Sequence, residues 1–414
     1  MNVLFVHQNL PGQYLHLAQH LARDPANRVH FLTQPNSNQL AGIEKVVYQV
    51  ESRVPTLCHP FSMEFDRQVT VGTAAAEAAS QLAETGYRPD LIVGHAGWGE
   101  LLYLQDVFAN APILGNFEFY YHGDGNDVGF DPEFESIFNS KARLHTRNAT
   151  ILLSFESVTW GHTATRWQQS LHPPALRAGL SVLHEGADTD IACPNPSAHF
   201  LLPNGRVLNR HDQVITYVAR NLEPYRGFHT FMRALPQIQR AHPKAEVVLV
   251  GGDGVSYGAP HAPGSSFRQW LLDEVGDQLD LTRIHFVGQI AYDRYLQLLQ
   301  LSAAHVYLTY PFVLSWSFIE AMSIGCVVIG SRTAPVMEVL QDGVNGLAVD
   351  FFSADEIAAA VTTALTKPRI AARLRRAARQ TAITRYDLKR RQLPAWVRLL
   401  DDLQHGRTPE TDHG

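Results

Sequence analysis

The sequence has few cysteines, no strong excess of charge and no recognisable set of metal ligands. Three cysteines occur in 414 residues, at the widely spaced positions Cys58, Cys193 and Cys326. This spacing provides neither a disulfide framework nor a metal-binding cluster, and it favours a reducing compartment such as the cytoplasm. The net charge of −6 gives no overall electrostatic basis for binding nucleic acid.

Long apolar segments are also missing. No stretch approaches the roughly 20 apolar residues that a membrane-spanning helix needs. The chain begins with the strand-like run NVLFV, and we see no basic region, apolar core and cleavage site typical of a signal peptide. We therefore expect a cytoplasmic protein, and peripheral contact with the inner face of a membrane remains open.

Metal and cofactor sites have no clear signature. The 20 histidines are scattered without the spacing of a zinc site. The segment HGDGNDVGFD contains Asp124 and Asp127 but supplies no third defined ligand for a hard cation. We expect neither a metal nor an organic cofactor.

The residues that are present predict two α/β domains. Hydrophobic residues make up 45% of the chain, and strand-like runs alternate with helical patterns in both halves, which favours two doubly wound parallel sheets. Ligands of such sheets bind at the carboxyl ends of the strands. We predict an N-terminal domain at residues 1–195, a Pro/Asn/Gly-rich linker at 196–210, a C-terminal domain at 211–388, a helix at 389–405 and a disordered tail at 406–414.

The segment Thr309–Asp350 contains the clearest predicted binding site. Its pattern is a strand, a small-residue loop and a helix, with Ser315, Trp316 and Ser317 where the loop becomes helix. Free backbone N–H groups at a helix start suit a diphosphate, and the Glu320 carboxylate one turn later suits sugar hydroxyls. A strand–helix–strand unit without a ligand is the alternative.

A second group of candidate ligands lies upstream. Arg220 ends a predicted strand and Arg226 precedes the next helix, so their guanidinium groups could hold a diphosphate from two sides. Predicted strands also end at the glycines of GGDG, which include Gly252, and at Gly288. Two solvated loop arginines are the alternative, but several features converge on one ligand.

As a set, these motifs resemble those of the family 4 glycosyltransferases. The family's G-R-L and E-K-G elements correspond to ARNLEPYRG, its strand-ending glycines to GGDG and HFVG, and its E-G-F-G-L-x-x-x-E-A-M-A-x-G block to FVLSWSFIEAMSIG. The later G-x-x-E-x-V-x-D-G-x-x-G motif corresponds to APVMEVLQDGVNG. The similarity extends over essentially the whole chain. It implies the GT-B fold, a retaining and metal-independent sugar transfer, and a final helix that packs on the N-terminal domain.

The resemblance also implies roles for single residues. Arg220 and Arg226 would hold the diphosphate of a nucleotide sugar, and Glu320 would bind its ribose. Backbone amides at Ser315, Trp316 and Ser317 would contact phosphate or sugar, Gly288 would line the base pocket, and Gly12 would let the first loop approach the donor.

One position departs from the family pattern. The first glutamate of the family's E-x7-E motif corresponds to Phe312, and the following glycine to Val313. That glutamate usually contacts the transferred sugar, and a phenylalanine cannot accept hydrogen bonds from hydroxyl groups. We expect altered selection of the donor sugar, with impaired activity as the alternative.

Acceptor chemistry is predicted in the N-terminal half. His95 and Glu118 follow consecutive predicted strands, where either side chain could orient or deprotonate an acceptor hydroxyl. Aromatic faces suit sugar rings, so an acceptor platform could include Asn9, Trp98, Tyr120 and Tyr121. A histidine satisfied by its surroundings and aromatic core packing are the alternatives.

We therefore expect a glycosyltransferase that moves a sugar from a nucleoside-diphosphate donor to a hydroxyl acceptor. On family grounds the acceptor is a saccharide or a lipid-linked glycan for polysaccharide synthesis. A catalytically silent nucleotide-sugar sensor or partner subunit is an alternative, since Phe312 replaces a glutamate. A nucleotide-sugar 2-epimerase is another, and Phe312 argues against it.

Overall fold

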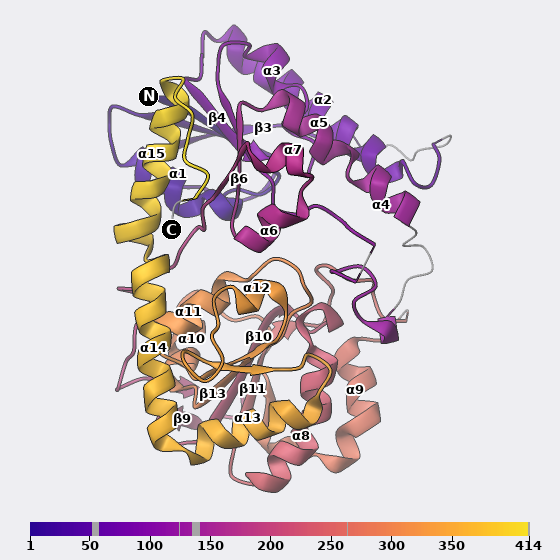
Figure 1. The fold of residues 1–414 in the computed structure, drawn as a ribbon, viewed down its shortest axis with the longest axis vertical. Coiled ribbons are helices and arrows are strands. Elements are labelled where there is room, and N and C mark those ends of the chain that lie inside the picture. Colours follow the sequence, from indigo (N-terminus) through magenta and orange to yellow (C-terminus); the bar gives the residue numbers. More distant parts are fainter. Residues whose placement is uncertain (52–57, 124, 135–140, 263, 413–414) are drawn as a thin grey trace. The chain divides into compact units, whose positions relative to one another are not determined.

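The computed structural model describes residues 1–51, 58–123, 125–134, 141–262 and 264–412. The chain forms two compact units, each built around its own parallel sheet (Figure 1). The first unit contains Met1–Glu185 and Lys389–Gly414, and the second contains Gly186–Leu388. The prediction of two α/β domains with doubly wound parallel sheets is confirmed.

The first unit has a seven-stranded sheet in which all pairings are parallel. Strand β1 is buried from Val3 to Val6, as expected for a central strand with helices on both faces. The strands, in spatial order, are β3 (Ile43–Val47), β2 (Arg28–Thr33), β1 (Asn2–Val6), β4 (Leu91–His95), β5 (Ile113–Asn116), β6 (Trp160–Thr163) and β7 (Leu180–Val182).

Helices cover this sheet with small and apolar side chains. Ala75 and Ala79 of the longest helix are fully buried and belong to the same core cluster as Leu4 and Ile92 of the strands. The helices are α1 (Leu15–Ala22), α2 (Met63–Glu84), α3 (Leu104–Val107), α4 (Lys141–Arg147), α5 (Ala149–Ser157), α6 (Arg166–Leu171), α7 (Pro174–Arg177) and α15 (Leu393–Gln404).

The last helix and the segment after it belong to the first unit. On α15, the Trp396 indole N–H donates to the His184 carbonyl at 3.3 Å, and Figure 1 shows α15 beside α1. The prediction of a disordered tail is wrong for residues 410–412. The Val182 N–H donates to the Thr411 carbonyl at 2.9 Å, and the Ser181 hydroxyl donates to the Glu410 carbonyl. The tail thus covers the edge strand β7, whose backbone groups would otherwise lack partners.

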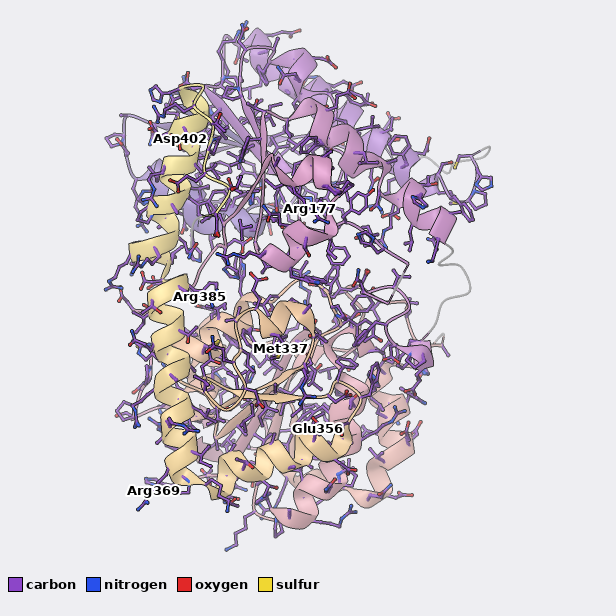
Figure 2. All side chains as sticks on the ribbon, in the orientation of Figure 1. Arg177, Met337, Glu356, Arg369, Arg385 and Asp402 are labelled. Carbon is purple, nitrogen blue, oxygen red and sulfur yellow. The ribbon has the colours of Figure 1, made fainter. Side chains whose placement is uncertain are left out.

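The second unit has a six-stranded parallel sheet. Its strands, in spatial order, are β12 (Ile284–Phe286), β11 (Glu246–Gly252), β10 (Val214–Asn221), β13 (Ala304–Tyr307), β14 (Val328–Ser331) and β15 (Leu347–Val349). Its helices are α8 (Phe228–Ala241), α9 (Phe267–Val275), α10 (Tyr292–Leu301), α11 (Trp316–Ile324), α12 (Ala334–Met337), α13 (Ala354–Thr366) and α14 (Pro368–Tyr386). Figure 2 shows Arg369 and Arg385 near the two ends of α14.

The predicted linker is part of the second unit in this structure. Residues 196–210 contain the antiparallel hairpin of β8 (His199–Leu201) and β9 (Val207–Asn209). Phe200 and Leu208 are buried in a core cluster of that unit. The Arg206 guanidinium, between the two strands, also donates to the buried Glu246 carboxylate at 2.5 Å. Alternating exposed and buried residues along three-residue strands give too weak a pattern to predict this hairpin.

Across the described ranges, no helix combines the length and the apolar character needed to cross a bilayer.

Candidate functional site

The candidate residues gather where each sheet reverses its strand order. In the first unit the reversal lies between β1 and β4, and in the second unit it lies between β10 and β13. Chain connections leave the two neighbouring strands in opposite directions at such a point, so a crevice opens at their carboxyl ends. In the first unit, Gly12 follows β1 and His95 ends β4. In the second unit, Arg220 lies near the end of β10, Arg226 follows β10, and Ser315 follows β13.

In the second unit, Arg226 joins two loops. It ends the 3₁₀ helix Pro224–Arg226 after β10, and its side chain is only 8% exposed. Its Nη1 donates to the Thr309 hydroxyl at 2.9 Å and to the Val313 carbonyl at 3.1 Å, both in the loop after β13. The Tyr307 hydroxyl lies 3.3 Å from the same nitrogen. Arg226 therefore places a permanent cation beside the loop that begins helix α11.

Arg220 differs from Arg226 in its surroundings. Its residue is exposed near the carboxyl end of β10, and its carbonyl accepts a long hydrogen bond of 3.4 Å from the Gln289 side chain. The sequence predicted two comparable guanidinium groups flanking one loop. The structure instead contains one exposed arginine and one arginine fixed within the protein.

The start of α11 lies beside Arg226, and its amides are partly occupied. Ser315 is the N-cap residue, and its hydroxyl accepts from the Ser317 N–H at 3.4 Å. The Ser315 N–H donates to the Tyr307 hydroxyl at 2.8 Å. The expectation of a free amide is therefore wrong for Ser315, because a buried tyrosine from the adjacent strand supplies its partner. The partial positive charge of the helix start remains next to the Arg226 guanidinium.

Glu320, one turn into α11, accepts two hydrogen bonds from helix α10. The Tyr292 hydroxyl donates to its Oε1 at 2.6 Å, and the Tyr295 hydroxyl donates to its Oε2 at 2.8 Å. Burial raises the pKa of the Glu320 carboxyl, and the two tyrosine hydroxyls act in the opposite direction by stabilising the charged form. The sequence reasoning missed both tyrosines, although their i, i+3 spacing after the Gly288 turn places them on one helix face.

Phe312 belongs to an aromatic cluster instead of facing a polar site. It is 7% exposed, and its ring lies 5.0 Å from Tyr257 and 5.7 Å from Tyr225, between ring centroids. Tyr257 also lies 5.1 Å from the Arg226 guanidinium carbon, within the range of a cation–π contact. The position where the family pattern places a carboxylate is thus filled with aromatic carbon.

A buried glutamate holds the loop that carries Tyr257. The Glu223 carboxylate accepts from the backbone N–H groups of Ser256, Tyr257 and Gly258 at 2.9–3.2 Å. Three such bonds fix the loop after β11 against the loop after β10. Sequence reasoning did not find this link, because the four residues have no shared motif.

The predicted glycines of the second unit serve different purposes. At Gly252, which ends β11, an added Cβ would lie 2.7 Å from the Asn221 Oδ1, so a side chain would collide with the neighbouring strand end. Gly288 has a φ of +67°, which other residues rarely adopt, while nothing lies within 4 Å of an added Cβ. Gly252 permits a close approach, whereas Gly288 permits a turn.

In the first unit, Gly12 lies directly over a buried histidine. It begins the 3₁₀ helix Gly12–Tyr14 with a φ of +55°, and an added Cβ would lie 2.8 Å from the His7 ring. Burial, with a smaller effect from the adjacent His95, lowers the pKa of His7 to about 4, so His7 is neutral near pH 7. The His7 and His95 rings meet edge to face at 5.9 Å. Gly12 is therefore required by close packing in the first loop.

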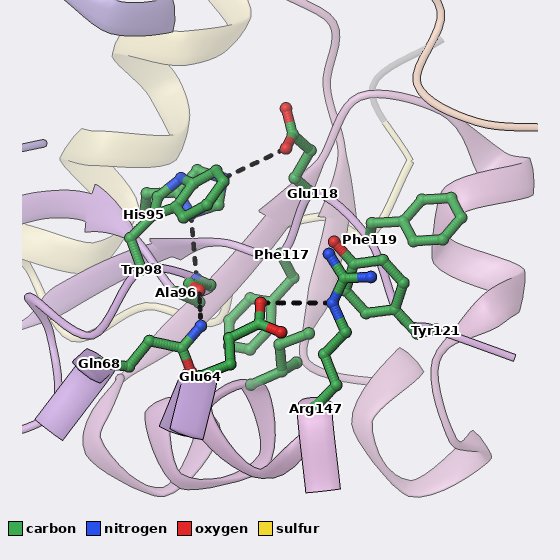
Figure 3. A pocket seen from close by; sticks show the side chains of 12 residues that line it. Glu64, Gln68, His95, Ala96, Trp98, Phe117, Glu118, Phe119, Tyr121 and Arg147 are labelled. Atoms are coloured by element: carbon green, nitrogen blue, oxygen red, sulfur yellow. Dashed lines mark hydrogen bonds and ion pairs between the residues drawn. The ribbon is translucent and has the colours of Figure 1, made fainter. Parts of the chain in front are cut away.

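His95 faces the carboxylate of Glu118. Its Nδ1 accepts from the Gly97 N–H at 3.0 Å, so the proton of the neutral ring belongs on Nε2. That nitrogen lies 3.6 Å from the Glu118 Oε2, longer than a hydrogen bond. Figure 3 shows both side chains at one pocket. The structure brings the predicted pair together in an arrangement that a bound hydroxyl group could complete.

This pocket has polar and aromatic walls. Its cavity volume is about 30 Å³, space for one or two water molecules. Trp98 is 39% exposed and lies 5.2 Å from the His95 ring, while the Arg147 guanidinium lies 3.6 Å over the Tyr121 ring. Arg147 also pairs with Glu64 at 3.3 Å. Of the predicted platform, Trp98 and Tyr121 line the pocket (Figure 3), whereas Asn9 and Tyr120 do not.

The acidic segment after β5 is only partly described. Asp124 lies outside the described residues, and Asp127 is buried.

Comparison with known families matches most of the chain. Residues 25–192 match the glycosyl transferase family 4 group, and residues 204–381 match the glycosyl transferases group 1. A glycogen synthase of Mycobacterium tuberculosis is 28% identical over 173 residues, which are 42% of this chain and 39% of that protein. A GDP-mannose-dependent α-(1-6)-phosphatidylinositol monomannoside mannosyltransferase of Mycolicibacterium smegmatis is 24% identical over 246 residues, 56% of this chain and 58% of that protein.

The chain thus spans well under two thirds of the length of these curated relatives. Its fold is similar over nearly the full length to a solved structure, the sucrose-phosphate synthase of Thermosynechococcus elongatus. The TM-score is 0.75 at 19% identity, and the match covers 98% of this chain and 100% of the other.

Proposed function

Because the chain belongs to the family 4 group of glycosyltransferases and has the GT-B fold, we propose that it transfers a sugar from a nucleoside-diphosphate sugar to a hydroxyl acceptor. We further propose that the transfer retains the anomeric configuration. The matched mannosyltransferase depends on GDP-mannose, a donor of this class.

The link from Arg226 to the loop before α11 supports the donor site most strongly. The Arg226 Nη1 lies 3.1 Å from the Val313 carbonyl, so a fixed cation lies at the loop from which α11 starts. Negative charge grows on the diphosphate as the sugar–phosphate bond breaks, and a preorganised cation and helix start stabilise that charge. Arg220, exposed at the end of β10, would close on the phosphates from the solvent side.

Each polar group in this proposal has a separate task. Arg220 and Arg226 hold the diphosphate, the amides at Trp316 and Ser317 contact phosphate or sugar, and Glu320 binds the ribose. Gly252 and Gly288 keep the strand ends open to the nucleotide, and Gly12 keeps the first loop compact. The leaving diphosphate needs no metal ion in this scheme, because arginine and helix charges neutralise it.

The pocket of the first unit suits the acceptor. Glu118 can accept the proton of an attacking hydroxyl, and the His95 Nε2–H can orient that carboxylate. The exposed Trp98 ring offers a face for a sugar ring. We propose a saccharide or lipid-linked glycan as acceptor, in keeping with the phosphatidylinositol monomannoside in the name of one relative.

A silent nucleotide-sugar sensor is the second candidate, favoured by Phe312. The aromatic cluster of Phe312, Tyr225 and Tyr257 offers no acceptor carboxylate to the transferred sugar. A sensor would bind the donor without releasing nucleoside diphosphate.

Thermal-shift measurements with UDP-, GDP-, ADP- and dTDP-sugars test the proposal, with Arg220→Ala as the matched variant. We expect one donor class to raise the melting temperature of the wild type and to lose most of this effect in Arg220→Ala. Release of nucleoside diphosphate in the presence of saccharide acceptors then separates transferase from sensor. No stabilisation by any donor would overturn both candidates.

A further inference from the structure

The Glu320 carboxylate is held from one side by two tyrosines of the neighbouring helix. Tyr292 is the first residue of α10, and Tyr295 follows three residues later on the same face. Their hydroxyls donate to different oxygens of the carboxylate, at 2.6 Å to Oε1 and at 2.8 Å to Oε2. The two contacts together fix both the position and the plane of the carboxylate.

This arrangement leaves acceptor capacity on each carboxylate oxygen. An ionised carboxylate has about four lone-pair sites, two on each oxygen. Each tyrosine uses one site, so each oxygen can still accept one further hydroxyl hydrogen. Two hydroxyls on adjacent carbon atoms, as in a ribose ring, match two acceptors fixed side by side.

We propose that Tyr292 and Tyr295 are positioning residues that hold Glu320 for the 2′- and 3′-hydroxyls of the donor ribose. This inference rests on the proposed function, because it concerns the same donor site. The tyrosines contact Glu320 and act on the nucleotide through it.

The two tyrosines contribute unequally. Tyr295 is 8% exposed and belongs to the core cluster that contains Phe318 and Met322 of α11. This packing holds its ring, and therefore its hydroxyl, in one position. Tyr292 is 52% exposed, and water competes for its hydroxyl. The Tyr292 ring contacts the Tyr295 ring, with 5.8 Å between the ring centroids. Loss of the Tyr295 hydroxyl therefore affects Glu320 more than loss of the Tyr292 hydroxyl.

The tyrosines also keep the carboxylate charged. Burial raises the pKa of Glu320, and both hydroxyls offset part of that rise. A protonated carboxyl would lose one acceptor position and become a poorer partner for two hydroxyls. In tyrosine-to-phenylalanine variants, the binding of Glu320 to the ribose diol should therefore weaken more at low pH than at neutral pH.

Calorimetric titration with paired nucleotides tests the inference. The probes are the nucleoside diphosphate that binds the wild type and its 2′,3′-dideoxy analogue, which lacks only the two hydroxyls. We expect the wild type to prefer the ribose form, Glu320→Gln to lose most of that preference, and Tyr295→Phe to reduce it about 5-fold, the size of one net hydrogen bond. Tyr292→Phe should reduce it by a smaller factor.

The dideoxy analogue separates positioning from a general structural effect. A positioning role leaves its affinity unchanged in Tyr295→Phe, whereas damage to the fold weakens both nucleotides equally. Equal weakening, or an unchanged ribose preference in both phenylalanine variants, would overturn the inference while the donor site stands. Absence of Arg220-dependent binding of any nucleoside diphosphate to the wild type would overturn the proposed function and this inference together.

Discussion

The two sheets end in candidate sites of different construction. In the second unit two of the charged groups are each held by at least two partners: Arg226 by the Thr309 hydroxyl and the Val313 carbonyl, and Glu320 by two tyrosines. In the first unit the His95–Glu118 pair is separated by 3.6 Å and borders a small cavity. The hydrogen-bonded groups of the second unit form a site that suits the constant nucleotide part of a donor. The more widely spaced pair of the first unit suits an acceptor whose hydroxyl group bridges the two side chains.

The largest contrast should appear in catalysis. Glu118→Gln removes the proposed proton acceptor of the first unit, and we expect turnover to fall by about 100-fold or more. Nucleotide affinity should not change, because Glu118 is not part of the second unit. Steady-state kinetics with a saccharide acceptor provide the measurement, and Glu64→Gln in the same pocket is the matched control with a smaller expected loss. An equal fall in turnover in Glu118→Gln and Glu64→Gln would contradict the role of Glu118 as the proton acceptor.

The second contrast concerns the two arginines. Arg226→Ala leaves the Thr309 hydroxyl and Val313 carbonyl without their buried partner, so we expect the free energy of unfolding to fall by about 3 kcal/mol. Arg220→Ala changes an exposed side chain and should stay within about 0.5 kcal/mol of the wild type. Urea denaturation compares them. Similar stabilities of the two variants would show that Arg226 is not a structural anchor.

The first unit should be the more sensitive to acid. Burial lowers the pKa of His7 to about 4 and that of His162 to about 3, from about 6.5 in the unfolded chain. The unfolded state therefore takes up protons first, so this stability is present above pH 6.5 and is lost as the pH falls toward 4. For His7, the fall of the pKa from about 6.5 to about 4 corresponds to about 3 kcal/mol. Melting temperatures at pH 7 and pH 5 should differ less in His162→Gln than in the wild type; an equal difference would contradict this cause.

The smallest contrast compares two glycines with similar backbone angles. Gly12 and Gly288 both have positive φ values, +55° and +67°, so alanine costs about 1 kcal/mol at either position. At Gly12 the added methyl group also meets the His7 ring at 2.8 Å, whereas at Gly288 it meets nothing within 4 Å. Gly12→Ala should therefore destabilise the protein by about 1 kcal/mol more than Gly288→Ala. If chemical denaturation showed equal losses of stability in Gly12→Ala and Gly288→Ala, this would contradict the close packing of His7 and Gly12.

The sequence predicted the sheets and the positions of most candidate ligands, because strand–helix alternation and strand-ending glycines are local patterns. A strand predicted to end at the glycines of GGDG, for example, is observed as β11, which ends at Gly252. The hairpin of β8 and β9 was not predictable, because its three-residue strands carry too weak a pattern. The pairing of residues 410–412 with β7 was not predictable, because its partner strand lies far away in the sequence.

The internal partners of the site were similarly hidden. Arg226 reaches residues 83 and 87 positions away, and Glu320 reaches tyrosines 25 and 28 positions away. No sequence motif marks such pairs, so residue type pointed to the candidate ligands but not to the residues that hold them. Phe312 was recognised as a departure from the family pattern, but its contacts with Tyr225 and Tyr257 emerged only from the fold.

Titration of a nucleoside diphosphate into the wild type, Arg220→Ala and Glu118→Gln tests the division of labour between the two units most directly. We predict that Arg220→Ala weakens binding more than 10-fold, the expected loss of a charge-assisted contact, and that Glu118→Gln binds like the wild type. Weaker binding in Glu118→Gln with unchanged binding in Arg220→Ala would place the nucleotide in the first unit and contradict the proposed donor site.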